Sequence, residues 1–218
     1  MLTKEQKATL KTIFSTGVRD IASWGGGTAL SEIYLHHRRS EDIDIILSDL
    51  PAGDILTTLS NQIAEKIEAK SKESGSKMNR FQYVFELPDK KQQKLEFIYY
   101  PFPKLGRIKK IDQIKVESLF DIAVSKTLTA YQRREVKDAF DLYIILSNKH
   151  FTLDRLIVGV EKKFGEIVDT AALLAKISSI LNDYVKLTPM IIKNKYSKKN
   201  MLEFFQKELE QFLKKNKL

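Results

Sequence analysis

Cysteine is absent from the 218-residue chain, and histidine occurs only three times. The lack of cysteine excludes disulfide bonds, a catalytic thiol and a zinc site with cysteine ligands, and it is compatible with a reducing compartment. Two of the histidines are the adjacent pair His36 and His37. Because a histidine-based metal site needs several separated ligands, we do not expect one in this chain.

Long apolar runs are also missing. No stretch approaches the length of a membrane span, and the first residues lead into a polar amphipathic helix instead of a signal peptide. Hydrophobic residues make up 43% of the chain and charged residues 30%, which is ordinary for a globular protein with a substantial core. We therefore expect a cytoplasmic protein without a membrane partner.

Basic residues outnumber acidic ones, with 37 Lys and Arg against 28 Asp and Glu and a net charge of +9. An excess of this size favours polyphosphate partners such as RNA. It is uneven, because residues 186–218 hold nine lysines and three glutamates. A lysine-rich proteome would give the same excess, so charge alone leaves RNA binding open.

Two aspartates stand two residues apart in the run Asp42-Ile43-Asp44-Ile45-Ile46. The alternation and the β-branched residues favour a strand that projects both carboxylates from one face. Two neighbouring anions repel each other unless a cation binds them, and Mg²⁺ binds through one or two carboxylates together with substrate phosphates. The alternative is a solvated strand face without a metal.

A run of three glycines, Gly25 to Gly27, precedes this strand, and residues 28–33 after it have the character of a helix start. Glycines allow backbone N–H groups to approach an anion closely, although such a run is also typical of an ordinary turn. Fourteen residues separate Gly27 from Asp42, enough for a short helix and a return into an adjacent strand. The order of these features predicts a nucleoside triphosphate site.

The stretch Gly26-Gly27-Thr28-Ala29-Leu30, followed by His37-Arg38-Arg39-Ser40-Glu41-Asp42-Ile43-Asp44, resembles motif I of the AbiEii-type nucleotidyltransferases. With matches further along, the resemblance covers roughly residues 20–148. This family belongs to the polymerase β-like superfamily and includes toxins of bacterial toxin–antitoxin and phage-defence systems. The resemblance implies an NTP substrate, two Mg²⁺ ions on the aspartates, and triphosphate contacts from Gly26, Gly27, Thr28 and Arg39. An arginine next to acidic residues also often only balances their charge.

A third acidic residue, Glu96, lies in the second strand of an expected hairpin formed by residues 78–87 and 94–100. Its position between Leu95 and Phe97 favours a solvated carboxylate by spacing alone. In the family's fold, however, a third carboxylate on a strand beside the Asp pair shares a metal ion. The resemblance therefore implies that Glu96 is a metal ligand, although the family often has aspartate there.

Lys126 lies on or beside the apolar face of an expected helix, at helical spacing from Leu119, Ile122 and Ala123. A buried lysine must either extend to solvent or meet an anion. The string from Leu119 to Lys126 resembles the family helix whose lysine faces the nucleotide phosphates. The resemblance thus implies a catalytic, nucleotide-binding role for Lys126.

Asp138 and Asp141 share one face near the start of the next expected helix, where acidic residues also stabilise a helix by capping it. The string Lys-Asp-x-x-Asp-Leu-Tyr over residues 137–143 is similar to the last family motif. The resemblance implies that Asp138 belongs to the active site beside Lys126. It also implies that Asp141 orients neighbouring groups.

The remaining pattern predicts an α/β (α+β) fold, with a small mixed sheet packed with helices in residues 1–110 and a helical region in residues 111–218. Hydrophobic spacing and caps also predict a first helix from Thr3 to Gly17 and a short strand over residues 19–23. Other expected elements are a helix opened by Pro51, a loop over residues 71–76, a lysine-rich loop around Pro189, and helices over about 152–164, 169–184 and 200–215.

These expectations describe a nucleotidyltransferase that moves a nucleoside monophosphate from an NTP to a hydroxyl. The resemblance implies the 3′ end of tRNA as acceptor and a toxin held by a separately encoded antitoxin. A protein or a small molecule as acceptor would use the same catalytic residues. A non-catalytic basic RNA-binding protein and a metal-dependent nuclease also stay open.

Overall fold

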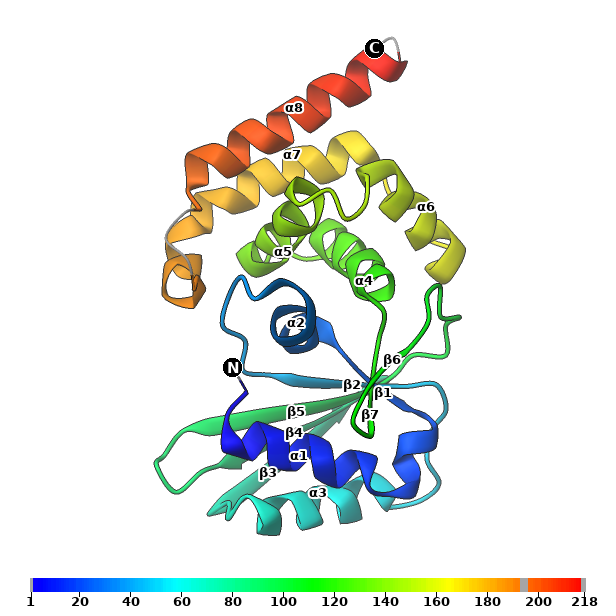
Figure 1. The fold of residues 1–218 in the computed structure, drawn as a ribbon, viewed down its shortest axis with the longest axis vertical. Helices are drawn as coiled ribbons and strands as arrows, with labels where there is room; N and C mark the ends of the chain where they lie inside the picture. The colour runs from blue at the N-terminus through cyan, green and yellow to red at the C-terminus, as the bar shows by residue number, and fades with distance from the viewer. Residues whose placement is uncertain (1, 193–195, 217–218) are drawn as a thin grey trace. The chain divides into compact units, whose positions relative to one another are not determined.

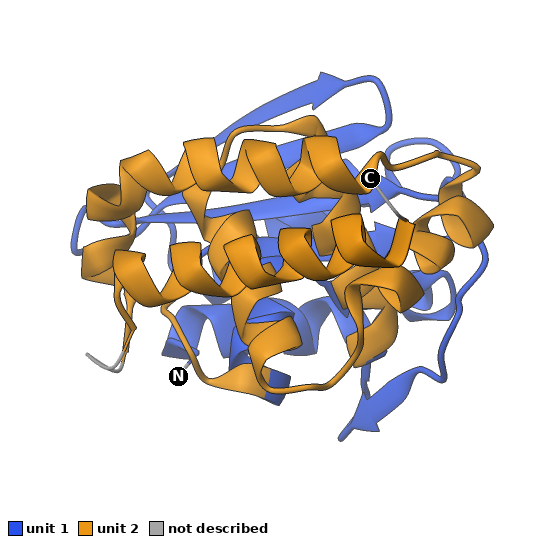
Figure 2. Ribbon diagram, turned by 90° about the horizontal axis from the view of Figure 1, so that it is seen from above, with its two compact units in different colours: residues 1–34, 40–118 blue, residues 35–39, 119–218 orange. Residues whose placement is uncertain are grey.

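The computed structural model describes residues 2–192 and 196–216 (Figure 1). The chain divides into two compact units, coloured separately in Figure 2. The first unit comprises Met1–Tyr34 and Ser40–Ser118, and the second comprises Leu35–Arg39 and Leu119–Leu218. The main boundary between the two units therefore lies between residues 118 and 119, eight residues beyond the end of the first domain expected from the sequence. The domain assignment itself stays a prediction.

The first unit contains a seven-stranded mixed sheet in the order β3-β4-β5-β2-β1-β7-β6. β2 pairs with β5 and β1 pairs with β7 in parallel, while the other neighbours are antiparallel. The strands are β1 (Ala22–Gly25), β2 (Ile43–Leu47), β3 (Ser71–Lys77), β4 (Arg80–Glu86), β5 (Gln92–Tyr99), β6 (Lys109–Ile111) and β7 (Ile114–Val116). The predicted mixed sheet and the predicted hairpin of β4 and β5 are confirmed.

Figure 1 shows α1 (Lys4–Phe14) and α3 (Ile55–Lys66) side by side on one face of this sheet, with the short α2 (Gly26–Ala29) on the other. α2 runs directly into a π-helix, η2 (Leu30–Leu35). Thr3 begins α1 in a capping box with Gln6, as its side chain and backbone exchange hydrogen bonds with that residue. The predicted first helix is thus confirmed, although it ends at Phe14, before Gly17.

The core of the first unit follows the two-residue period of its central strands. Ile43 and Ile45 in β2, and Leu95 and Phe97 in β5, are completely buried. Residues between them point to the opposite face, where burial is incomplete. The sequence alternation therefore separates a hydrophobic face from a face that carries acidic side chains.

Residues 71–76 were expected to form a loop, and this prediction was wrong. They belong to β3, which pairs along its whole length with β4. β3 is an edge strand with almost every residue exposed, so its sequence needs no hydrophobic alternation and its lysines deter pairing with other chains. Backbone hydrogen bonds to β4 therefore keep this segment extended, although its side chains alone do not identify it as a strand.

Other boundaries in the first unit also differ from expectation. The strand expected over residues 19–23 is β1, displaced toward the glycines, and the 3-10 helix η1 (Gly17–Asp20) precedes it. The helix expected from Pro51 begins at Ile55 with Asp54 at its N-cap position. The hairpin of β6 and β7 was not expected at all.

The second unit is helical, as predicted. Its elements are α4 (Leu119–Gln132), α5 (Val136–Ser147), α6 (Leu153–Phe164), α7 (Thr170–Ile180), the 3-10 helix η3 (Leu181–Met190) and α8 (Lys198–Asn216). α8 packs on α5 and α7 through Met201 and Phe205. Gly165 ends α6 with a left-handed φ of 69°.

Pro189, expected in a loop, lies in η3, so that expectation was wrong. Within the described residues, every helix is too short or too polar to span a bilayer.

Candidate functional site

The glycine bend and the second aspartate are in contact in the first unit. β1 ends at Gly25, whose partner in β2 is Asp44. Gly26 follows with a φ of 69°, and a Cβ added there would lie 1.8 Å from Asp44 Oδ2. The Asp44 carboxylate thus occupies the space that a side chain at position 26 would fill, which explains why only glycine fits there.

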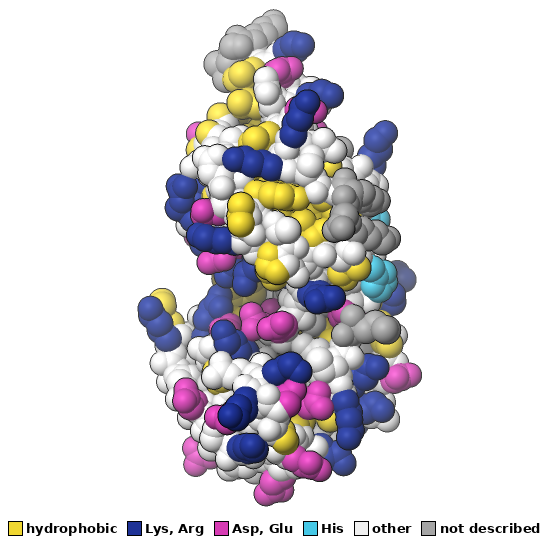
Figure 3. Space-filling view, turned by 90° about the vertical axis from the view of Figure 1, so that its left-hand side faces the viewer, with side chains coloured by type: hydrophobic (Ala, Val, Ile, Leu, Met, Phe, Trp, Pro, Cys, Tyr) yellow, Lys and Arg dark blue, Asp and Glu magenta, His cyan; other side chains and the backbone are white. Residues whose placement is uncertain are grey.

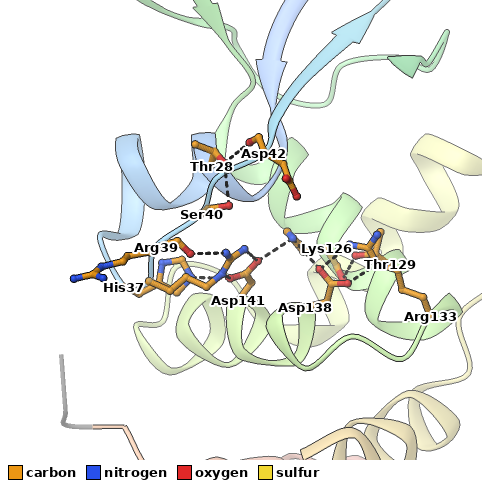
Figure 4. Close-up of polar contacts among 11 residues, drawn as sticks. Thr28, His37, Arg39, Ser40, Asp42, Lys126, Thr129, Arg133, Asp138 and Asp141 are labelled. Atoms are coloured by element: carbon orange, nitrogen blue, oxygen red, sulfur yellow. Dashed lines mark hydrogen bonds and ion pairs between the residues drawn. The ribbon is translucent and has the colours of Figure 1, made fainter. Parts of the chain in front are cut away.

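Thr28 connects the start of α2 to the residues before β2 (Figure 4). Its fully buried hydroxyl donates a hydrogen bond to the main-chain carbonyl of Asp42 and lies 2.9 Å from Ser40 Oγ. Asp42 and Asp44 are both partly exposed, and Ile43 between them is buried. The backbone at Asp42 is therefore fixed to the helix that begins at the glycine bend.

Glu96 is the register partner of Asp44 in the parallel pair of β2 and β5. Register partners in a parallel pair project to the same face, so both carboxylates belong to the incompletely buried face. The Glu96 carboxylate is 2.9 Å from Arg80 Nη1. Among residues 2–192 and 196–216, no three His, Cys, Asp or Glu side chains gather as a metal site. Metal binding by Glu96 therefore stays a prediction.

The donors at Asp42 and Asp44 fit Mg²⁺ in their chemistry. Both supply carboxylate oxygens, with that of Asp44 directly at the backbone bend, and Mg²⁺ completes its octahedron with substrate phosphates and water. A site with two protein carboxylates is therefore compatible with an ion that binds together with its substrate. Both aspartates stay predicted metal ligands.

Two residues beside the bend had no signal in the sequence analysis. Glu117, only 4% exposed, follows β7, and one of its carboxylate oxygens would lie 2.7 Å from a Cβ at Gly25. The other oxygen forms an ion pair with Lys104. The short β6–β7 hairpin that delivers Glu117 was not predicted, so nothing in the sequence placed it near the glycines.

In the second unit, Lys126 is almost completely buried and lies 2.8 Å from both Asp138 and Asp141 (Figure 4). Burial alone would lower the pKa of Lys126, but the negative charges of Asp141 and Asp138 outweigh it and raise the pKa. Arg133 also binds Asp138 at 2.6 Å. The predicted neighbourhood of Lys126 and Asp138 is present, and the lysine stays charged.

Asp141 has further partners from residues 35–39. Arg38 binds it through two nitrogens at 2.6 and 2.9 Å, and His37 Nε2 lies 2.7 Å from the same carboxylate. Burial would raise the pKa of Asp141, but the charges of Arg38 and Lys126, together with the hydrogen bonds from Arg38 and His37, hold it well below the usual range. Sequence reasoning included His37 and Arg38 in the motif but gave them no role.

Arg39, by contrast, is exposed. Its backbone N–H donates to the carbonyl of Met190 at 2.7 Å, and its own carbonyl accepts from Arg38. Both contacts involve the backbone of Arg39. Its predicted contact with a triphosphate stays a prediction.

The mixed sheet followed by a helical region defines a nucleotidyltransferase-like fold. A family model described as "Nucleotidyl transferase AbiEii toxin, Type IV TA system" matches residues 25–215. The chain belongs to this family, and the resemblance inferred from the motifs is confirmed.

Three similar proteins illustrate the relationship. An uncharacterized protein of Aquifex aeolicus is 29% identical over 168 residues, which cover 76% of this chain and 77% of that protein. The crystal structure of JHP933 from Helicobacter pylori has a TM-score of 0.58 at 19% identity, covering 98% of this chain and 94% of that one. A candidate nucleotidyltransferase from H. pylori has a TM-score of 0.59 at 18% identity, covering 96% and 95%. At these identities, the solved structures show the fold alone.

Proposed function

We propose that this chain transfers a nucleoside monophosphate from an NTP to the 3′ hydroxyl of tRNA in a Mg²⁺-dependent reaction. We also propose that it acts as the toxin of a toxin–antitoxin or phage-defence system, with a separately encoded antitoxin. Membership of the AbiEii family supports the reaction class. The observation that carries the proposal is the contact of the Asp44 carboxylate with the Gly26 bend, because these are the two features from which the sequence predicts a triphosphate site.

In this reaction the acceptor oxygen attacks the α-phosphorus, the bond from that phosphorus to the bridging oxygen breaks, and pyrophosphate leaves. Asp42 and Asp44 would hold two Mg²⁺ ions, which lower the pKa of the acceptor hydroxyl and offset triphosphate charge when bound. Gly26 and Gly27 would bind the β and γ phosphates through backbone N–H groups. Thr28 fixes the backbone of Asp42 through its hydroxyl.

The roles of the other predicted residues rest on the family resemblance. We propose that Lys126 neutralises charge on the leaving pyrophosphate and that Asp138 holds the Lys126 ammonium, a contact supported by their 2.8 Å separation. Arg39 would add a second cation, and Glu96 a third carboxylate. Asp141 orients Lys126 and Arg38 through its ion pairs.

The charge distribution supports an RNA acceptor. Residues 35–39 and 119–218 hold 20 Lys and Arg against 12 Asp and Glu, whereas residues 1–34 and 40–118 hold 17 against 16. The face in Figure 3 shows Lys and Arg side chains spread among acidic ones. The positive excess thus belongs to the helical unit, and a cationic surface attracts the phosphate backbone of RNA.

The test is incubation of the purified protein with total tRNA, Mg²⁺ and each α-labelled NTP in turn, followed by gel sizing. We expect label on tRNA, and we expect Asp42→Asn and Asp44→Asn to abolish it while circular dichroism stays unchanged. Asp49→Asn is the matched control, because Asp49 is an exposed aspartate shortly after β2 with the same change of charge.

Each other result assigns a different function. Label on protein or on a small molecule would replace the acceptor while keeping the reaction. RNA binding that survives both aspartate substitutions, with no label on any acceptor, would refute catalysis in favour of a basic RNA-binding protein. Shortening of tRNA without added NTP would indicate a nuclease.

A further inference from the structure

Two carboxylates press against consecutive glycines at the bend. A Cβ at Gly26 would lie 1.8 Å from Asp44 Oδ2, and a Cβ at Gly25 would lie 2.7 Å from Glu117 Oε2. A negatively charged carboxylate therefore lies against each of these two glycines. A polyphosphate bound to the backbone N–H groups there would be repelled unless cations lie close by.

Lys104 provides such a cation from the loop between β5 and β6. Its ammonium forms an ion pair with Glu117 Oε1 and lies 3.3 Å from Ser23 Oγ. Ser23 precedes the bend by two residues on β1. One carboxylate group thus contacts Gly25 through one oxygen and the Lys104 ammonium through the other, which places the ammonium beside the bend.

Glu117 is fixed at both backbone groups. Its N–H donates to the carbonyl of Trp24 at 2.9 Å, and its carbonyl accepts from the Tyr34 hydroxyl at 2.7 Å. Its side chain is 5% exposed, whereas that of Lys104 is 26% exposed. The carboxylate is therefore shielded from solvent while the ammonium it holds remains accessible.

We propose that Lys104 is a polyphosphate-binding residue of the glycine bend and that Glu117 positions it. A lysine ammonium has three N–H donors, and the contacts given by the described residues, Glu117 and Ser23, use two of them. The third is available to a phosphate oxygen. The identification of this polyphosphate as the triphosphate of an NTP rests on the proposed function.

The alternative is a purely structural ion pair that closes the loop onto β1 and β7. It predicts that removing the ammonium lowers the melting temperature but leaves anion affinity unchanged. Polyphosphate binding separates the two explanations, because a structural contact does not change the affinity for an anion bound elsewhere.

The experiment is calorimetric titration of the full chain with inorganic tripolyphosphate in Mg²⁺ buffer. We expect Lys104→Gln to weaken binding by about tenfold or more, the usual effect of one hydrogen bond to a charged group, and Lys104→Arg to restore part of it. Lys72→Gln is the matched control, because Lys72 is also held by two polar side chains, Ser60 and Asn61, but on β3 at an edge of the sheet. Its affinity should equal that of the wild type.

The role of Glu117 is tested by a double-mutant cycle. Glu117→Gln should weaken tripolyphosphate binding while Lys104 is present, because the ammonium is no longer held at the bend. It should not weaken binding once Lys104→Gln has been introduced, because only the loss of a repelling carboxylate then remains. Equal effects in both backgrounds would refute the positioning role. Wild-type affinity in Lys104→Gln, or a wild type that does not bind tripolyphosphate, would overturn the binding role.

The outcomes also separate this inference from the proposed reaction. Tripolyphosphate binding that depends on Lys104, in a protein that labels no acceptor, would leave the anion site standing and remove the transferase function. Label transfer by Lys104→Gln with unchanged KM for NTP and unchanged tripolyphosphate affinity would keep the transferase function and remove the role of Lys104 in anion binding.

Discussion

Replacing Asp141 by asparagine tests the most heavily buried charges of the second unit. Asp141 is completely buried and binds Arg38, Lys126 and His37. Asparagine keeps nearly the same shape but removes the negative charge. The perturbation therefore isolates electrostatics from packing.

The size of the effect follows from what each partner retains. Lys126 still has Asp138 at 2.8 Å after the substitution. Arg38, with a side chain only 1% exposed, keeps the carbonyl of Arg39 at 3.1 Å as an uncharged acceptor and loses its carboxylate. Removing one partner of a buried ion pair typically costs about 3–5 kcal/mol, since it leaves an uncompensated charge. We expect Asp141→Asn to destabilise the protein by that amount.

Urea denaturation followed by circular dichroism gives the free energy of unfolding of each variant from the midpoint and slope of its transition, and the difference between variants is this cost. Asp154→Asn is the control, because Asp154 pairs with Lys215 where both side chains are more than half exposed, and such pairs contribute about 0–1 kcal/mol. Adding Arg38→Met to Asp141→Asn should recover part of the loss, since it removes the buried charge that has lost the Asp141 carboxylate. A cost below about 1 kcal/mol for Asp141→Asn would refute the reasoning from buried charge.

Three further predictions concern the pH dependence of Asp141 and the substitution of two glycines. Because the pKa of Asp141 is depressed, its stabilisation is full above the unfolded pKa near 3.8 and is lost as pH falls below it, so an acid titration should destabilise the wild type more than Asp141→Asn. Gly26→Ala should lower label transfer by about 100-fold, because its Cβ would displace Asp44, while Gly17→Ala, with open space around it, should be active. Gly165→Ala should cost about 1 kcal/mol in thermal unfolding, because its φ of 69° strains alanine although no atom lies within 4 Å.

Periodic hydrophobic segments made most elements predictable. β2 and β5 alternate completely buried residues with residues that are less deeply buried, and α4, α5 and α6 repeat apolar residues at helical spacing. Local caps such as Thr3 and Gly165 gave two helix ends. These signals are local in the sequence, so they can be recognised without knowledge of the fold.

β3 and the contacts of Glu117 could not be predicted, for a different reason. β3 is held by its ladder with β4, and its exposed side chains carry no strand pattern. Glu117 reaches Gly25 only because β7 pairs in parallel with β1, a pairing between segments about 90 residues apart. Such contacts are set by topology, and one sequence read locally contains no signal for them.

The triple glycine has a packing role in addition to the phosphate contact that the sequence predicts. Glycines at such a bend were expected to expose backbone N–H groups to phosphate. At Gly25 and Gly26, the missing Cβ atoms make room for the carboxylates of Glu117 and Asp44. The conformational freedom of Gly26, with its left-handed φ, serves the same packing.

The near-neutral first unit constrains how it could bind a triphosphate. With 17 basic against 16 acidic residues in residues 1–34 and 40–118, its overall charge gives almost no attraction for an anion, and Asp44 and Glu117 at the bend oppose one. Under the proposed function, the affinity that this unit contributes would therefore arise locally, from Mg²⁺ on the aspartates, from backbone N–H groups and from the Lys104 ammonium. It follows that neutralising an exposed lysine elsewhere on this unit should hardly change NTP affinity, whereas neutralising Lys104 should change it strongly even though the net charge changes by the same amount.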